Sequence, residues 1–271
     1  HAEDFILYPK NKGYHLCIDE TALSKGELYT ILTNRDKHGR KGTIVAIVKG
    51  TKAEDVINVL LKIDADKRNQ VKEITLDMAG SMQKIAKRCF PGAMQVVDRF
   101  HVSKLVYEAV QDLRIAYRWQ VMKDENRKIK EAKAKGESYE PKVFSYGDTL
   151  RQLLARSRYL LFKAPDKWLQ SQKVRAKLLF EQFPDIKSVY YYALRLGKIF
   201  SDYTDKDVAR AKLALWYNEI EEFGYDTFTT VANSIENHYE RILNYFVNSS
   251  TNAAADLLMQ KLKHLGLHFV E

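Results

Sequence analysis

The sequence predicts an α/β fold that is interrupted by a large, all-helical insertion. Up to residue 98, short apolar runs typical of strands alternate with amphipathic segments typical of helices, whereas residues 99–247 show helical patterns only. Three predicted strands also end on an acid, at Asp19, Asp77 and Asp98. Carboxylates from different strands that meet at one edge of a sheet indicate a site for a hard metal ion.

Composition narrows the class of protein. A chain of 271 residues with 45% hydrophobic and 29% charged residues can bury the core of one large domain, or of one domain with an insertion. No apolar run approaches the roughly 20 residues of a membrane span, and no signal peptide is evident. The net charge of +9 favours a polyanionic partner, with nucleic acid ahead of a membrane surface.

The cysteines predict a reducing compartment. Cys17 and Cys89 both lie in positions predicted to be buried and do not form a disulfide framework, so we expect a cytoplasmic protein. A zinc site made of these two residues and His101 is a disfavoured alternative, because the sequence holds no closely spaced Cys/His pair. The chain begins at His1 rather than at methionine, so we expect an N-terminal portion to be missing.

The first part of the chain gives the element order of the core. Residues 1–13 form a polar lead-in, and the strands expected after it cover residues 14–19, 28–33, 43–48, 73–77 and 94–98. A capping box at Thr51 and Glu54 opens a first helix, which buries Val56, Val59, Leu60 and Ile63, and a second helix covers residues 81–89. The predicted order is three strands, a helix, a strand, a helix, a strand and a helix. This is the order of an RNase H-like core with a mixed five-stranded sheet.

The insertion follows as a series of helices. They are expected at residues 99–133, 148–163, 167–183, 185–203, 205–223 and 226–247, with Asp148, Asp205 and Asp226 as N-caps. We expect the first part of the α/β core at residues 14–115, the insertion at 116–247 and a last helix of the core at 248–271.

One stretch of the insertion is strongly basic. Asp166 is the only acid in residues 151–177, and a surface that faces phosphates accounts for this excess better than ordinary salt-bridge patterning does. The interleaved Tyr159, Phe162 and Trp168 are expected to belong to an aromatic core. The candidate DNA contacts are Arg151, Arg156, Arg158, Lys163, Lys167, Lys173, Arg175 and Lys177.

Eight motifs spread over nearly the whole chain carry a resemblance to a known family. They are Ile18-Asp-Glu-Thr21, Gly26-Glu-Leu-Tyr29, Lys49-Gly-Thr-Lys-Ala-Glu-Asp55, Thr75-Leu-Asp-Met-Ala79, Asp98-Arg-Phe-His-Val102, Ser157-Arg-Tyr-Leu-Leu-Phe162, Lys212-Leu-Ala-Leu-Trp-Tyr217 and Ser250-Thr-Asn-Ala-Ala-Ala255. Together they resemble the DDE transposases of bacterial insertion sequences, in the ISL3 subgroup. The resemblance implies an RNase H-like core, and the zinc-binding and helix-turn-helix region that this family carries upstream does not appear in the chain.

The resemblance assigns the site residues. It implies that Asp19, Asp77 and an acid near Asp256 hold two Mg²⁺ or Mn²⁺ ions, whereas Asp98 and His101 support the site without being primary ligands. Its partners would be double-stranded DNA, both transposon ends and target, and further copies of the chain in the active assembly. No membrane partner is expected, and the location would be the bacterial cytoplasm.

The third acid departs from the family pattern. After the alanines the family reads Glu-Ser-Phe-Asn-Ala-Lys-Ile-Lys-Ala-Phe-Arg, whereas this chain continues from Asp256 as Asp-Leu-Leu-Met-Gln-Lys-Leu-Lys-His-Leu-Gly. Residues 255–265 can be encoded so that one added adenine restores the family wording. We therefore expect a one-base deletion at the glutamate codon and a truncated end, the alternative being that Asp256 works as a ligand.

Three functions are compatible with these observations. The first is a transposase that cuts transposon-end DNA and joins its 3′ hydroxyls to a target. The second is a catalytically dead remnant that still folds and binds DNA. A plain RNase H-type nuclease is the third, and it is disfavoured because it leaves the long basic insertion without a purpose.

Overall fold

The computed structural model describes residues 4–22, 26–224 and 226–248. The chain forms two compact units, and α4 (Arg99–Ala134), α8 (Lys206–Phe223) and α9 (Asp226–Asn237) each contribute to both. Among the described residues, the sheet unit comprises residues 4–22, 26–102, 204–210 and 235–248, and the helical unit comprises residues 103–203, 211–224 and 226–234. In the described part of the chain, no helix combines the length and apolar character needed to cross a membrane.

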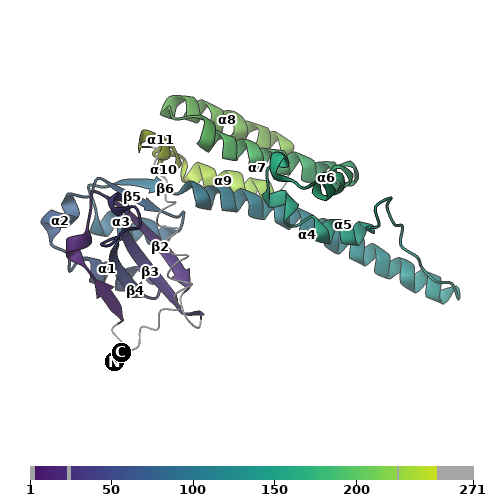
Figure 1. Cartoon of the computed structure of the whole chain (residues 1–271), viewed down its shortest axis with the longest axis horizontal. Coiled ribbons are helices and arrows are strands. Elements are labelled where there is room, and N and C mark those ends of the chain that lie inside the picture. Colours follow the sequence, from purple (N-terminus) through teal and green to yellow (C-terminus); the bar gives the residue numbers. More distant parts are fainter. Residues whose placement is uncertain (1–3, 23–25, 225, 249–271) are drawn as a thin grey trace. The chain divides into compact units, whose positions relative to one another are not determined.

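The sheet unit is built on six strands in the order β1-β4-β3-β2-β5-β6 (Figure 1). The first four strands in that order pair antiparallel, whereas β2, β5 and β6 pair parallel, so the sheet is mixed. The strands are β1 (Phe5–Leu7), β2 (His15–Ala22), β3 (Leu28–Asn34), β4 (Ile44–Lys49), β5 (Glu73–Leu76) and β6 (Met94–Val97).

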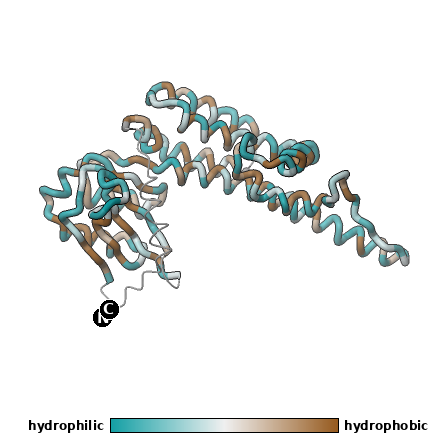
Figure 2. Tube along the Cα trace, in the orientation of Figure 1, coloured by the Kyte–Doolittle hydropathy of each residue, from teal (hydrophilic) through white to brown (hydrophobic). Residues whose placement is uncertain are grey.

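The two faces of the sheet bury different side chains, because successive residues of a strand point to opposite faces. On one face Leu16, Ile18 and Leu32 pack against α1 (Ala53–Leu60) and α3 (Gly80–Cys89) in the main core. On the other face Ile31 and Ile47 form a smaller cluster. Figure 2 shows the hydrophobic colour concentrated in these strands.

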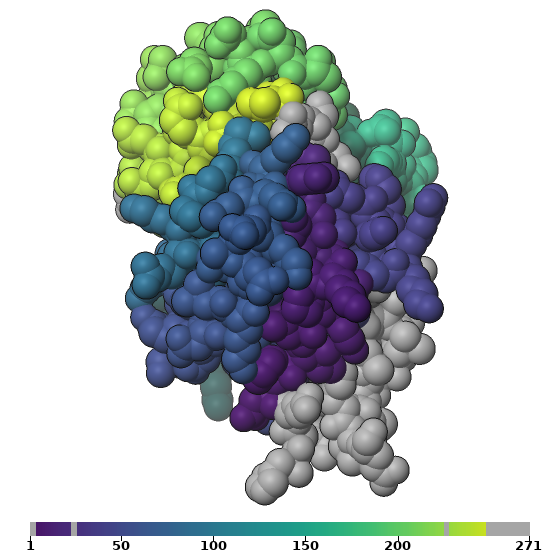
Figure 3. Space-filling model, turned by 90° about the vertical axis from the view of Figure 1, so that its left-hand side faces the viewer, coloured from purple at the N-terminus to yellow at the C-terminus, as the bar shows by residue number. Residues whose placement is uncertain are grey.

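The edge strand β1 corrects the expected five-stranded sheet to six. Residues 1–13 were expected to be a polar lead-in, but Phe5–Leu7 pairs antiparallel with β4. Phe5 and Leu7 pack against the main core, and the purple N-terminal surface lies beside blue residues of the same unit in Figure 3. Three residues are too short a run for the alternation of a strand to stand out in the sequence.

Other corrections concern helix ends. α1 begins at Ala53 with Lys52 as its N-cap and no side-chain cap, so the capping box expected at Thr51 and Glu54 does not form. The expected burial of Val56, Val59, Leu60 and Ile63 is confirmed. The short helix α2 (Ala65–Asn69) lies between α1 and β5, and β6 runs directly into α4.

The helical unit contains the long α4, whose distal part is hydrophilic in Figure 2, and a series of shorter helices. Thr149 rather than Asp148 caps α5, and it does so in a capping box with Gln152. Asp205 does cap α8, because its Oδ1 accepts from the backbone N–H groups of Asp207 and Val208. The further elements are α5 (Leu150–Arg156), η4 (Leu160–Phe162), η5 (Pro165–Lys167), α6 (Gln170–Gln182), α7 (Pro184–Asp202), α10 (Tyr239–Leu243) and α11 (Tyr245–Asn248).

A buried carboxylate links α5 and α6. The side chain of Asp148 is 1% exposed, and its two oxygens accept from Arg156 and, at 2.9 Å, from Nε of Arg175. This explains why Asp148 is not a helix cap: both of its oxygens are used by guanidinium groups.

The helix expected at residues 226–247 is divided into α9, α10 and α11, with breaks at His238 and Asn244.

Candidate active site

Three aspartates occupy one row across the parallel strands. Cys17 of β2 pairs with Thr75 of β5, and Asp19 and Asp77 each stand two positions further along. Leu76 of β5 pairs with Val97 of β6, so that Asp77 and Asp98 are the next positions of that pair. The three aspartates therefore share a register and a face of the sheet.

The row continues across the antiparallel strands as apolar side chains. Asp19 pairs with Ile31, Ile31 with Ile47, and Ile47 with Ile6. Because Ile31 and Ile47 form the smaller cluster, the carboxylates lie on the face opposite to α1 and α3. The site is thus the place where an apolar row gives way to three acids.

Local backbone structure explains how each acid is held. β5 is buried over its whole length, and the chain leaves the sheet at Asp77, whose Oδ1 accepts from the Ala79 N–H at 2.8 Å. Asp98 is 3% exposed and precedes α4, and its Oδ1 accepts from the Phe100 N–H at 3.0 Å. The strand ends predicted at these two acids are confirmed to within one residue.

Asp19 differs from the other two because β2 does not end there. The strand continues to Ala22, so the prediction of a strand end at Asp19 is wrong. The antiparallel partner β3 accounts for this, since it pairs with β2 along residues 16–22 and extends it. Asp19 nevertheless lies two residues beyond Cys17, the last residue of β2 that pairs with β5. Asp77 lies two residues beyond Thr75, the partner of Cys17, so the two acids are at equivalent positions.

The carboxylates repel one another. Burial raises the pKa of Asp19, and the charges of Asp77 and Asp98 raise it further, against the opposing effect of His101 and of the Glu20 N–H. His101 Nε2 lies 3.9 Å from Asp19 Oδ1, and the Asp19 side chain is 24% exposed. An excess of negative charge that the protein itself does not neutralise is typical of a site that receives a cation.

Glu20 is a further carboxylate near the row of acids, and the sequence analysis did not single it out. Burial raises its pKa, and so do the charges of Asp77 and Asp19, so it lies within electrostatic reach of both. Its only signal in the sequence is its place in the motif Ile18-Asp-Glu-Thr21.

The donor set suits a hard cation, although it is incomplete in the described residues. Asp19 and Asp77 offer oxygen ligands, which Mg²⁺ and Mn²⁺ prefer. Within residues 4–22, 26–224 and 226–248, no group of three or more His, Cys, Asp or Glu residues is arranged to hold a metal ion. The third expected ligand, Asp256, lies outside the described residues.

The zinc alternative receives no support from the fold. Cys17 is buried in β2 on the face that carries Asp19, whereas Cys89 belongs to the main core on the opposite face. Burial raises the pKa of the Cys89 thiol to about 11, which disfavours the thiolate that zinc requires.

The returning helices contact the loop that follows Asp77. His238 Nε2 lies 2.8 Å from the Met78 carbonyl oxygen and 2.9 Å from Nε2 of Gln83. Arg241 donates to Oε1 of Gln83 at 2.8 Å, and Asn244 donates to the Gln95 carbonyl at 3.0 Å. The breaks at His238 and Asn244 thus place two side chains that connect α10 to the loop after Asp77 and to β6, a role that the sequence did not reveal.

The predicted DNA contacts all lie in the helical unit. Arg156 and Arg175 share Asp148, so part of their charge is neutralised internally. The other six candidates are exposed: Arg151, Arg158, Lys163, Lys167, Lys173 and Lys177. Whether these residues contact DNA stays a prediction.

The aromatic residues of this stretch behave differently from the expectation of a common core. Trp168 packs against Tyr190, with ring centroids 5.6 Å apart, and donates to the Leu160 carbonyl at 2.8 Å. In contrast, Tyr159 is 68% and Phe162 46% exposed. The prediction of a core position is therefore wrong for these two residues, because α5 ends at Arg156 and the following turns present them to solvent.

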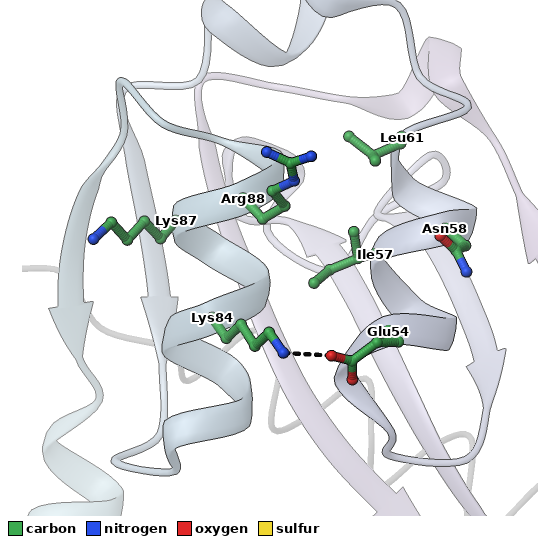
Figure 4. Close-up of a pocket in the computed structure, with 7 residues that line it drawn as sticks. All are labelled: Glu54, Ile57, Asn58, Leu61, Lys84, Lys87 and Arg88. Carbon is green, nitrogen blue, oxygen red and sulfur yellow. Dashed lines mark hydrogen bonds and ion pairs between the residues drawn. The ribbon is translucent and has the colours of Figure 1, made fainter.

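A groove of about 570 Å³ lies between α1 and α3, away from the acids (Figure 4). Lys84 and Glu54 form an ion pair across it, and its other lining residues are Ile57, Asn58, Leu61, Lys87 and Arg88. Because α1 and α3 cover the face opposite to Asp19, this groove is separate from the row of carboxylates.

Comparison with known proteins gives one match. A family model described as a transposase, that of the ISL3 group of DDE transposases, matches residues 16–266, which is most of the chain. No curated protein and no solved structure matches the chain.

Proposed function

The chain belongs to the ISL3-type DDE transposase family, and from this premise we propose that it cleaves the DNA of an insertion sequence and transfers its strands to a target. The sheet unit is the catalytic core, of RNase H-like type. Its strand order, with three antiparallel strands followed by two parallel ones outside the added β1, supports that assignment.

The observation that carries the proposal is the shared register of Asp19, Asp77 and Asp98. In a family that acts on DNA, three acids in one row with unneutralised charge favour metal-dependent phosphoryl transfer. When bound, two Mg²⁺ or Mn²⁺ ions would supply activation of the attacking oxygen and stabilisation of the leaving oxygen. Asp19 and Asp77 would hold them, together with an acid near Asp256.

The neighbouring residues take supporting roles. Asp98 is nearly fully buried, and one of its oxygens is bonded to the start of α4, so we assign it to positioning that helix rather than to ligation. His101, on the first turn of α4, favours the ionised form of Asp19, which is the form that binds a cation.

The partners follow from the family and the charge. Transposon-end and target DNA are the substrates, and the net charge of +9 suits both. We further propose that the active form is a homo-oligomer and that the protein works in the bacterial cytoplasm.

A second candidate function is a remnant that binds DNA without breaking it. It is favoured by one feature, the aspartate at position 256 where the family pattern has glutamate. Aspartate is one methylene shorter, and a misplacement of about 1 Å at a catalytic centre can cost on the order of 10²-fold in rate.

The test is Mg²⁺- or Mn²⁺-dependent nicking and joining with a supercoiled plasmid that carries the transposon ends. Asp19→Asn and Asp77→Asn should each lower the rate by more than about 10²-fold without loss of DNA binding. Glu54→Gln is the matched control, because it removes an acid of the same unit on the opposite face, and its rate should equal that of the parent. Equal and measurable rates for all four proteins would refute the assignment.

A further arm separates the two candidates. The given chain is compared with Asp256→Glu and with a chain whose tail has the restored reading frame. Gain of joining only in the altered chains would make the given chain a remnant, whereas equal joining would make Asp256 a working ligand.

A further inference from the structure

A cleft in the helical unit lies between one face of α4 and the turns that follow α5. Its volume is about 730 Å³, which is the size of a small-molecule site. From α4 it is lined by residues three to four apart, and from the other side by Ala155, Arg158, Tyr159 and Phe162. The lining residues of α4 are Glu108, Gln111, Arg114, Ile115, Arg118, Trp119 and Met122.

The cleft carries positive charge that the protein does not balance. It is lined by Arg114, Arg118 and Arg158, and none of the three forms an ion pair with any residue in the described ranges. The only acid of the lining, Glu108, faces Lys104 at 3.8 Å on its own helix. Burial lowers the pKa of Arg114, and the charges of Arg118 and Arg158 lower it further.

Buried hydrogen bonds fix the shape of the cleft. Arg114 is 4% exposed, and it donates from Nε to Gln111 at 2.7 Å and from Nη1 to the Leu154 carbonyl at 2.8 Å. Gln111 in turn donates to the Arg158 carbonyl at 3.1 Å. These bonds join α4 to both ends of the turn that carries Tyr159, so the cleft is preformed.

One donor in the cleft lacks an acceptor. Nε of Arg118 is buried, and no residue in the described part of the chain accepts from it. Buried polar groups in folded proteins are nearly always hydrogen-bonded, so this N–H is left to a water or to a ligand acceptor that reaches it when the Arg118 side chain shifts. A phosphate oxygen is the acceptor that suits a guanidinium group best.

Exposed aromatic rings line both sides of the cleft. Trp119 of α4 is 58% exposed, and Tyr159 and Phe162 of the opposite side are 68% and 46% exposed. The guanidinium of Arg158 stands 5.4 Å from the centroid of the Tyr159 ring. Flat rings beside unpaired arginines form the combination that stacks bases and holds their phosphates in proteins that bind single strands.

We propose that this cleft binds an unpaired nucleotide of single-stranded DNA, with its base on Trp119 or Tyr159 and its phosphate at Arg118 and Arg158. This inference rests on the proposed function, because cutting and joining of transposon ends exposes unpaired strands. A duplex keeps its bases stacked within the helix and offers only its backbone to such a cleft, so the aromatic rings favour a single strand.

The test measures binding of the full chain to a fluorescein-labelled dT oligonucleotide and to a duplex of equal length, by anisotropy. Trp119→Ala and Arg118→Gln should each weaken single-strand binding by about tenfold and duplex binding by less than about threefold. Lys130→Gln is the matched control, since it removes one charge from an exposed position of α4 outside the cleft. Trp119→Phe keeps a ring, and it should restore most of the affinity lost in Trp119→Ala.

Three outcomes would overturn the inference. They are unchanged single-strand binding in both variants, equal losses for single strand and duplex, or a change in oligomeric state by light scattering without a change in DNA binding. The last result would make the cleft an interface between protein chains. Nicking by the parent chain is measured separately: a chain that shows the expected binding but cuts nothing retains the cleft assignment and loses the proposed function. A chain that cuts DNA, while its cleft variants bind single strands normally, retains the proposed function and loses the cleft assignment.

Discussion

Replacing Asp77 by asparagine should stabilise the metal-free sheet unit while it removes activity. Asparagine keeps the side-chain oxygen that accepts from the Ala79 N–H, so the turn after β5 is preserved. What is lost is one of the like charges in the row. Asp19 and Asp77 stand on adjacent parallel strands, whose axes are about 4.8 Å apart.

The size of the effect follows from this spacing. Two unit charges about 5 Å apart repel by roughly 3 kcal/mol at an effective dielectric constant of 20, and by roughly 1 kcal/mol in water. The Asp19 side chain is 24% exposed, and His101 offsets part of the repulsion. We therefore expect the free energy of unfolding to rise by about 1 kcal/mol in Asp77→Asn, which corresponds to about fivefold slower opening.

Hydrogen exchange of peptides from β2 and β5 is the suitable assay. All three tryptophans, Trp119, Trp168 and Trp216, belong to the helical unit, so their fluorescence does not report on the sheet unit. Exchange in EDTA should slow by about fivefold in the variant. Mg²⁺ at ten times its dissociation constant should then stabilise only the parent chain, by about 1.4 kcal/mol.

The control and the refuting result are well separated. Glu54→Gln removes an exposed acid that is paired with Lys84, so its exchange in β2 and β5 should remain within about twofold of the parent. Faster exchange in Asp77→Asn than in the parent, both without metal, would show that the charge of Asp77 stabilises the fold. The row of acids would then be a structural network and not a prepared cation site.

Two further predictions concern stability. Asp148→Asn should destabilise the helical unit by about 2 kcal/mol in urea unfolding followed by tryptophan fluorescence, because it leaves two arginines without their buried carboxylate, whereas the exposed Asp166→Asn should change it by less than about 0.5 kcal/mol. Burial raises the pKa of Asp36, but hydrogen bonds from the His15 ring and from the backbone N–H groups of Tyr14 and His15 outweigh burial, so its pKa is lowered. The stabilisation from Asp36 is therefore complete above its unfolded pKa of about 3.9 and is lost as the pH falls below that value. Because the side chain is 37% exposed, the stabilisation amounts to at most about 1 kcal/mol. In Asp36→Asn, the protection of β2 against hydrogen exchange should therefore fall less between neutral and acidic pH than in the parent chain.

Much of the sheet unit was predictable because its strands are buried on both faces or alternate clearly. Apolar runs in the sequence predict the strands that contain Leu16, Leu32 and Ile74 and the apolar face of α1. All of these elements are present in the structure. β1 was missed because three residues at an edge carry too little pattern, and the capping box failed because Lys52 occupies the cap position. Both failures concern ends and edges, where tertiary contacts override local preference.

The helical unit shows the opposite balance. The extent of α4 was predicted to within one residue, because residues 99–134 contain no glycine or proline to end a helix. The role of Asp148, however, depends on two arginines 8 and 27 residues further along, and the exposure of Tyr159 depends on the end of α5. Sequence alone gave an excess of positive charge in this stretch, and only the fold separates the arginines that bind an internal carboxylate from those that line the cleft.

The separations of the acids in the sequence equal the register offsets of the parallel strands. His15, Leu16 and Cys17 pair with residues 58 positions later, and Asp19 and Asp77 are separated by the same 58 positions. Likewise, β5 pairs with β6 at an offset of 21, which is the separation of Asp77 and Asp98. A parallel pair brings two side chains level only when their separation equals the register offset, so an insertion or deletion between a paired residue and its acid, such as between Cys17 and Asp19 or between Thr75 and Asp77, would separate the acids. A change in the length of α1, α2, α3 or their loops alters the separation and the offset equally, so the site constrains the strand segments next to the acids and not the lengths of these helices.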